Sequence, residues 1–166
     1  SWDFDGQEIF KRAVQGMVQA SQAVMAKCGV TPEDIDLVVP HQANQRIIDA
    51  VVSRSGVPPE KVMLTVERYG NMSAATVPVA LAEALEEGRV KPGALILMPA
   101  FGAGLTVCAH LVRWGERVTP LSQSDAALPA PTKSALEMIQ AIRAGKTNVP
   151  QRSGEGLQRP RFIEQM

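Results

Sequence analysis

Two polar side chains, His41 and Asn71, each follow an apolar run and precede a segment with helical character. A neutral imidazole offers one N–H and an asparagine amide offers two. Donors of this kind can bind the negative charge that develops on an oxyanion. Because the carboxyl ends of parallel strands meet at one edge of a sheet, we expect the two side chains to share a pocket. Taken singly, His41 is equally explained as a core or capping histidine, and Asn71 is better explained as a turn residue in the left-handed region.

His41 is expected to be neutral at physiological pH. It lies just before a predicted helix, and the positive end of a helix dipole disfavours an imidazolium. A neutral ring could polarise a carbonyl group through its single N–H. His110, the other histidine, lies within a predicted strand and is interpreted as structural.

A third turn, Phe101-Gly102-Ala103-Gly104, follows another apolar run. It could expose backbone N–H groups to the same pocket. It is too short for a phosphate-binding loop and contains no lysine. An ordinary glycine-containing hairpin turn explains it as well.

The apolar pattern predicts the elements that would position these turns. Residues spaced three and four apart predict helices, short apolar runs predict strands, and glycines at 29, 56 and 88 end the helices. Helices and strands that alternate along a chain indicate an α/β fold with parallel strands and crossover helices. The expected helices span 6–28, 42–55 and 74–87, and the expected strands span 35–40, 62–66, 94–99 and, as an antiparallel hairpin partner, 105–114.

The composition excludes several classes of function. The 166 residues carry 17 basic and 17 acidic side chains, so a large nucleic-acid surface is not expected. No apolar run reaches the roughly 18 residues that span a bilayer. The first residues show no signal-peptide pattern. With only Cys28 and Cys108, neither a disulfide scaffold nor a metal site is expected, and we expect a cytoplasmic protein. Both thiols are predicted to be buried and apolar, which leaves no nucleophile.

The amino-acid composition of the chain changes after residue 118. Prolines among Ser, Ala and Asp predict a linker over 119–133, and apolar spacing predicts a short helix over 134–144. Residues 145–166 are predicted to be a polar tail. The expected organisation is therefore one folded region, 1–118, followed by a linker, a helix and a tail over 119–166.

The turns and their order resemble one family of enzymes. From about residue 5 to 115 the chain is similar to the C-terminal half of β-ketoacyl-acyl-carrier-protein synthase III, a thiolase-fold condensing enzyme. This resemblance implies an α/β fold of the thiolase type, the second half of a duplicated βαβαβαββ arrangement with a mixed sheet flanked by helices. The matching stretches are DGQEIF (5–10), TPEDID (31–36), PHQANQRI (40–47), YGNMSAA (69–75), VP (77–78) and AFGAG (100–104).

The resemblance also implies roles for the turn residues. His41 and Asn71 match the catalytic pair that binds the thioester oxygen of malonyl-acyl carrier protein as carbon dioxide leaves. Phe101 matches a phenylalanine beside the active site, with Gly102 and Gly104 lining it. Ala103 matches a position, usually glycine, whose N–H completes an acyl oxyanion hole.

Binding residues and partners follow from the same resemblance. Ala43, Asn44 and Ile47 match positions near the mouth of the pantetheine tunnel, and Arg46 matches a basic position that docks the acidic carrier protein. The implied substrates are acyl-CoA and malonyl-acyl carrier protein, with no cofactor and no metal. The family's nucleophilic cysteine belongs to an N-terminal half that nothing here matches. We therefore expect an incomplete catalytic module that forms a homodimer when complete, with no nucleic-acid or membrane partner.

Two other functions remain open at this point. The chain could be a non-catalytic thiolase-fold subunit that supports an active partner. It could also belong to a related thiolase-fold acyltransferase or a hydroxymethylglutaryl-CoA synthase. The presence of both His41 and Asn71 favours a condensing enzyme, because a purely structural subunit need not keep them.

Overall fold

The computed structural model describes residues 6–122, 126, 130 and 132–145. The chain divides into two compact units, residues 1–123 and residues 124–166, which are described separately. The first unit contains a three-stranded sheet of order β1-β2-β3. Its regular elements are α1 (Gly6–Cys28), β1 (Leu37–Val38), α2 (Gln45–Ser55), α3 (Val66–Tyr69), α4 (Thr76–Glu86), β2 (Leu95–Gly102) and β3 (Thr106–Arg113).

The sheet is mixed, as predicted. β1 runs parallel to β2, with Leu37 opposite Ile96, and β2 runs antiparallel to β3, with Ala100 opposite Cys108. Parallel neighbours need a crossover connection, whereas antiparallel neighbours can be joined by a short turn. The chain follows both rules, because the helices α2, α3 and α4 separate β1 from β2 and only residues 103–105 separate β2 from β3.

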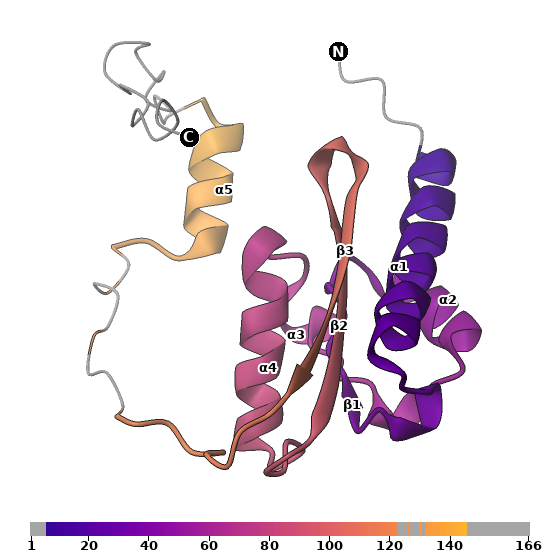
Figure 1. The fold of residues 1–166 in the computed structure, drawn as a ribbon. Coiled ribbons are helices and arrows are strands. Elements are labelled where there is room, and N and C mark those ends of the chain that lie inside the picture. The colour runs from indigo at the N-terminus through magenta and orange to yellow at the C-terminus, as the bar shows by residue number, and fades with distance from the viewer. Residues whose placement is uncertain (1–5, 123–125, 127–129, 131, 146–166) are drawn as a thin grey trace, which may run out of the picture. The chain divides into compact units, whose positions relative to one another are not determined.

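Helices cover both faces of the sheet (Figure 1). Successive strand side chains point to opposite faces. Val38 and Leu97 therefore pack with residues of α1 and α2. Leu37 and Ile96 pack on the other face, in a cluster that contains Ala80 and Ala84 of α4. The ends of β1 and β2 are thus fixed between two apolar layers, which holds the residues that follow β1 in place.

The close packing of α1 against β3 depends on a glycine. A Cβ atom added at Gly16 would lie 2.7 Å from Cγ2 of Val107, closer than side-chain carbons normally approach. The absence of a side chain at Gly16 therefore allows α1 to lie close to the hairpin. The same helix carries Phe10 and, at its first residue, Gly6, both of which line the pocket described below.

The predicted helices are confirmed, with small differences at their first residues. The helix predicted over 6–28 matches α1. The helix predicted from residue 42 begins at Gln45, and the one predicted from residue 74 begins at Thr76, after a single 3-10 turn. Gly29, Gly56 and Gly88 all have positive φ, between 66° and 76°, which explains why each one ends a helix.

The predicted strand over 35–40 is regular only at Leu37–Val38. Its parallel hydrogen bonds nevertheless continue beyond these residues. The N–H of Val39 donates to the carbonyl of Leu97 at 2.8 Å, and that of His41 donates to Pro99 at 2.9 Å. The backbone therefore stays alongside β2 as far as His41.

The predicted strand over 62–66 is wrong in most of its length. Val62 forms a single parallel bridge with Val38, and the N–H of Met63 donates to Val38 at 2.8 Å. Beyond this point the side chain of Gln42 takes the place of a neighbouring strand, because its Oε1 accepts from the N–H groups of Thr65 and Val66. The chain then turns into the short helix α3.

The prediction that both cysteines are buried is also wrong, since Cys28 and Cys108 are exposed. Cys28 is the last residue of α1. Cys108 belongs to the exposed row of β3, which alternates with the partly buried row that contains Ala109 and Leu111. His110 lies in the same exposed row, so it contributes nothing to the core.

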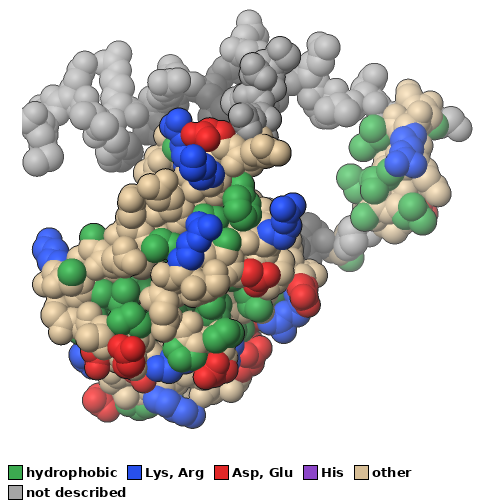
Figure 2. Space-filling model, turned by 90° about the vertical axis from the view of Figure 1, so that its right-hand side faces the viewer, with side chains coloured by type: hydrophobic (Ala, Val, Ile, Leu, Met, Phe, Trp, Pro, Cys, Tyr) green, Lys and Arg blue, Asp and Glu red, His purple; other side chains and the backbone are tan. Residues whose placement is uncertain are grey.

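The second unit contains α5 (Ala135–Arg143), which confirms the predicted short helix. Ser134 and Glu137 form a capping box: the Ser134 Oγ accepts from the Glu137 N–H, and the Glu137 carboxylate accepts from the Ser134 N–H at 2.7 Å. Four apolar side chains of α5 are exposed: Leu136, Met138, Ile139 and Ile142. Hydrophobic side chains, in green, are visible on the surface of the molecule in Figure 2. Residues 146–166 of the predicted tail, and parts of the predicted linker, lie outside the described residues.

The helices within the described ranges include none that is both long and apolar enough to cross a membrane.

Candidate active site

His41 lies at the end of the segment that follows β1 and is 8% exposed. Burial lowers the pKa of its imidazole below the ordinary value of 6.5, so the ring is neutral at pH 7. The sequence predicted neutrality from a nearby helix N-terminus. The cause in the structure is different, because α2 begins only at Gln45 and is capped by Asn44.

Two contacts fix the ring of His41. Its Nδ1 lies 2.6 Å from the hydroxyl oxygen of Thr76, the first residue of α4. The imidazole ring also packs against the ring of Phe101 in a T-shaped arrangement, with the ring centroids 5.4 Å apart and the ring planes at 78°. Nδ1 is therefore occupied, and Nε2 is the nitrogen that remains for a ligand.

Gln42, next to His41, is a residue whose role sequence reasoning missed. Its side chain is fully buried and makes four hydrogen bonds to backbone groups. Nε2 donates to the carbonyls of Pro40 and Met63 at 2.9 and 3.1 Å, and Oε1 accepts from two N–H groups of the segment after Met63. It thereby joins the two backbone segments that lead to His41 and to Asn71. Gln42 lies in the largely polar stretch 41–46, so nothing in the sequence distinguished it from its polar neighbours.

Asn71 follows Gly70 in a tight turn, as predicted. Its Oδ1 accepts a hydrogen bond from the N–H of Ser73 at 2.9 Å, which fixes the orientation of the amide. The left-handed residues here are Gly70, at φ 65°, and Ser73, at φ 57°, so Asn71 itself does not serve as the left-handed turn residue. Within the described part of the chain the NH₂ group has no hydrogen-bond partner, and it is free to donate.

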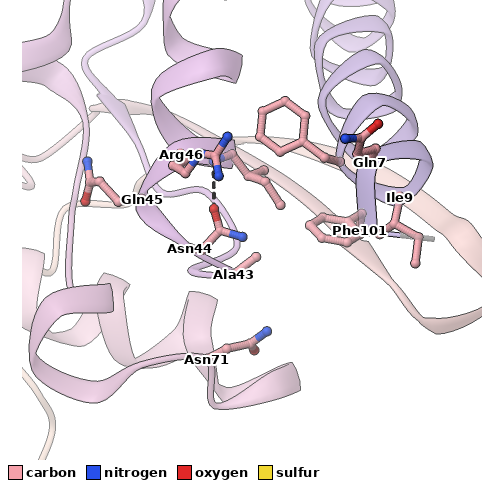
Figure 3. A pocket seen from close by; sticks show the side chains of 11 residues that line it. Gln7, Ile9, Ala43, Asn44, Gln45, Arg46, Asn71 and Phe101 are labelled. Carbon is pink, nitrogen blue, oxygen red and sulfur yellow. Dashed lines mark hydrogen bonds between the residues drawn. The ribbon is translucent and has the colours of Figure 1, made fainter. Parts of the chain in front are cut away.

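A pocket of about 1130 Å³ lies between α1, the start of α2, the Asn71 turn and β2. Figure 3 shows Asn71 on one side of this pocket, Ala43 and Asn44 on another, and Phe101 with the α1 residues beyond them. The lining is mixed, with several apolar side chains and a few amides. The lining residues are Gly6, Gln7, Ile9, Phe10, Ala43, Asn44, Gln45, Arg46, Ile47, Asn71 and Phe101.

His41 does not itself appear among the described lining residues, but two of its neighbours connect it to the pocket. Phe101 contacts the His41 ring and also lines the pocket. Thr76 contacts His41 and is only five residues beyond Asn71. Through Phe101, His41 therefore adjoins the pocket that Asn71 also lines.

The predicted binding residues at the start of α2 all line the pocket. Asn44 is the N-cap of α2, because its Oδ1 accepts from the N–H of Ile47 at 2.9 Å. The guanidinium of Arg46 lies 5.8 Å from the centroid of the Phe10 ring, within range of a cation–π contact. Arg46 is exposed, whereas Ile47 is buried, so this part of the lining presents a basic side chain to solvent and an apolar one to the interior.

The third predicted turn is the β2–β3 hairpin turn. Phe101 and Gly102 continue β2, and residues 103–105 form the turn, with Gly104 at φ 76°. Phe101 lines the pocket, while Gly102, Ala103 and Gly104 are absent from its described lining and are exposed. The structure therefore brings one residue of this stretch to the pocket and leaves the other three outside it.

The described residues offer neither a metal site nor a nucleophile at the pocket. Among them, no group of three His, Cys, Asp or Glu side chains could hold a metal ion. The described lining contains no cysteine, serine or threonine. The chemistry available here is hydrogen-bond donation in a partly apolar pocket, which suits the stabilisation of an anion.

Comparisons with known proteins agree with this interpretation. Residues 25–114 match the family described as 3-oxoacyl-[acyl-carrier-protein (ACP)] synthase III C terminal. The chain is 53% identical over 139 residues to beta-ketoacyl-[acyl-carrier-protein] synthase III 2 of Vibrio cholerae, which is 84% of this chain and 38% of the relative.

Solved structures confirm the predicted thiolase-like α/β fold. The crystal structure of the β-ketoacyl-[acyl carrier protein] synthase III from Thermus thermophilus matches with a TM-score of 0.66 and 50% identity, over 69% of this chain and 36% of that one. The priming β-ketosynthase from the R1128 polyketide biosynthetic pathway matches with a TM-score of 0.64 and 38% identity, over 68% and 34%.

The chain spans about a third of the length of these relatives. The stretch that matches the family model covers more than half of the 166 residues and contains both His41 and Asn71. The chain therefore belongs to the family of 3-oxoacyl-[acyl-carrier-protein] synthase III C-terminal regions.

Proposed function

We propose that this chain is the malonyl-activating part of a condensing enzyme that starts a fatty-acid or related acyl chain. The observation that supports the proposal is that Asn71 and Phe101 line one open pocket and that Phe101 also contacts the buried, neutral ring of His41. The amide of Asn71 has its oxygen engaged by Ser73, which leaves its N–H groups for a ligand. Family membership supports the same activity.

The proposed reaction has two chemical steps at this site. In the first, the bond between the carboxylate and C2 of the malonyl thioester breaks, carbon dioxide leaves, and the electron pair moves to the thioester oxygen. Nε2–H of His41 and the amide of Asn71 donate to this enolate oxygen, which carries more charge in the transition state than in the substrate. In the second, C2 attacks an acyl thioester held on a cysteine, and the cysteine thiolate leaves.

The lining of the pocket supports a role in binding the pantetheine arm of the substrates. Ala43, Asn44, Ile47 and Phe101 supply a mixed apolar and amide wall of the kind that a thioester-bearing chain requires. Arg46 is exposed at the rim and its charge suits the docking of an acidic carrier protein. In this proposal acyl-CoA and malonyl-acyl carrier protein are the substrates, and no cofactor takes part.

Two further elements of the proposal concern the acyl group. The backbone N–H of Ala103, which lies in the hairpin turn outside the described lining of this pocket, is proposed to donate to the acyl oxyanion in the complete enzyme. The nucleophilic cysteine comes from the part of the relatives' length that this chain does not span. Because Cys28 and Cys108 are exposed and neither lines the described pocket, neither is assigned this role. The complete enzyme is proposed to act in the cytoplasm as a homodimer.

The activity of a chimeric enzyme tests the proposed function. The chain is joined to the N-terminal part of the Vibrio cholerae relative, in place of that protein's own matching region, and the product of acetyl-CoA and malonyl-acyl carrier protein is measured. We expect the chimera to form 3-oxoacyl-acyl carrier protein, and the isolated chain to form none. The matched control is the same chimera with His41→Ala.

A folded chimera that neither labels its cysteine nor releases carbon dioxide would contradict the proposal. A chimera that labels its cysteine from acetyl-CoA but releases no carbon dioxide would instead support a non-catalytic subunit.

A further inference from the structure

The contact between His41 and Thr76 bears on which ring nitrogen of His41 carries the proton. Thr76 is fully buried, and its hydroxyl oxygen lies 2.6 Å from Nδ1 of His41 and 3.1 Å from the carbonyl oxygen of Ser73. The hydroxyl has one proton: it donates either to an unprotonated Nδ1 or to the Ser73 carbonyl, and in the second case its oxygen accepts from a protonated Nδ1. The direction of donation decides which nitrogen of His41 carries the ring proton.

Two observations decide the direction. The contact to Nδ1 is shorter by half an ångström than the contact to Ser73. At 3.1 Å the contact to Ser73 is long for an O–H donor, whereas 2.6 Å is a usual length, and the Ser73 carbonyl keeps the hydrogen bond from the backbone N–H of Thr76 when the hydroxyl donates to Nδ1. Nδ1 of a buried neutral imidazole has no such second partner among the described residues.

The geometry points to Thr76 as a positioning residue that donates its hydroxyl proton to Nδ1 of His41 and holds the ring in its Nε2–H tautomer. This inference rests on the proposed function for its consequence, since an Nε2–H can donate to an enolate oxygen. In the opposite tautomer, Nε2 would present a lone pair to that oxygen, and the two would repel each other.

The same short turn orients both proposed donors. The N–H of Ser73 holds the oxygen of Asn71 at 2.9 Å, which directs the amide NH₂ outward. Three residues later, Thr76 holds Nδ1 of His41. Residues 71–76 therefore set the polarity of both groups: an amide presented by its nitrogen, and an imidazole presented by its N–H.

The inference is tested on the complete enzyme with ¹⁵N-labelled histidine. The nitrogen shifts of neutral imidazole separate a protonated from an unprotonated ring nitrogen, and the His41 signals are assigned by their loss in His41→Gln. We expect protonated Nε2 and unprotonated Nδ1 in the wild type and in Thr76→Ser, which keeps the hydroxyl. Thr76→Val has nearly the same shape without the hydroxyl, and we expect it to show a mixture of tautomers.

Activity provides the second measurement. Carbon dioxide release from malonyl-acyl carrier protein should fall about ten-fold in Thr76→Val, because one positioning hydrogen bond is lost, and should be largely restored in Thr76→Ser. Transfer of the acyl group to the cysteine should stay unchanged, because it does not use the His41 N–H. A merely structural role would lower both reactions together.

A wild-type spectrum with protonated Nδ1 would overturn the inference, and so would a Thr76→Val enzyme with an unchanged tautomer. The wild-type spectrum decides the matter even where Thr76→Val fails to fold. It is also recorded on the resting enzyme, whereas the proposed function is judged by product formation in the wild type. Failure of one is therefore distinguishable from failure of the other.

Discussion

Asn71→Ala in the complete enzyme should reduce the release of carbon dioxide from malonyl-acyl carrier protein about 10²–10³-fold, the usual cost of removing one oxyanion donor. Acylation of the cysteine should remain close to wild type, because the Asn71 amide is assigned to the enolate oxygen alone. Each variant needs two measurements, which are carbon dioxide release and radiolabel transferred to the protein from acyl-CoA.

Asn71→Asp is the matched variant for this prediction. An aspartate keeps the shape of the side chain and can still accept the hydrogen bond from Ser73 that holds the turn. It loses the donor and places a charge beside the developing enolate, so decarboxylation should fall at least as far as in Asn71→Ala. If Asn71→Asp decarboxylated normally, Asn71 would be a turn residue and not a donor.

Gln42→Leu should lower the free energy of unfolding by about 3–5 kcal/mol. The side chain is fully buried and satisfies four backbone groups, and a buried group left without its partner costs about 1–3 kcal/mol. The leucine also cannot hold the segment after Met63 against the end of β1. The measurement is the urea unfolding midpoint of the variant and of the wild type.

Gln22→Leu is the control for that change. Gln22 is exposed on α1, so the same substitution there should change the free energy of unfolding by less than about 0.5 kcal/mol. A Gln42→Leu protein as stable as the Gln22→Leu protein would mean that the four hydrogen bonds contribute little to folding.

The elements that the sequence predicted well are those with a local cause. The apolar spacing along residues 6–28 predicts α1, and positive-φ glycines mark where helices end. The antiparallel strand over 105–114 also follows from local pattern, since its partner precedes it by one short turn. These features depend on neighbours in sequence, and they could be predicted without knowledge of the tertiary structure.

The parts that could not be predicted depend on distant contacts. Residues 62–66 have the composition of a strand, but Gln42, more than 20 residues earlier, takes over their hydrogen bonds. The alternation along β3 indicates that one row of side chains is more buried than the other, but it does not indicate which row. The exposure of Cys108 was therefore not predicted.

The candidate site shows the same division. His41 and Asn71 were identified from their residue types and from the turns that contain them. The contact between His41 and Thr76 spans 35 residues of sequence and left no signal in the sequence. The three residues after Phe101 were expected at the pocket, but they lie in or beside the hairpin turn and are absent from the described lining. The sequence thus indicated which donors are present, whereas the fold decides how they are oriented.

The central claim is that His41 and Asn71 serve one developing negative charge. The most direct test is a double-mutant cycle on carbon dioxide release, with His41→Ala, Asn71→Ala and the double variant in the complete enzyme. Groups that act on the same charge are non-additive, so the double variant should lose clearly less activity than the product of the two single losses. A double variant whose loss equals that product, or an Asn71→Ala enzyme that releases carbon dioxide normally but cannot be acylated, would contradict the claim.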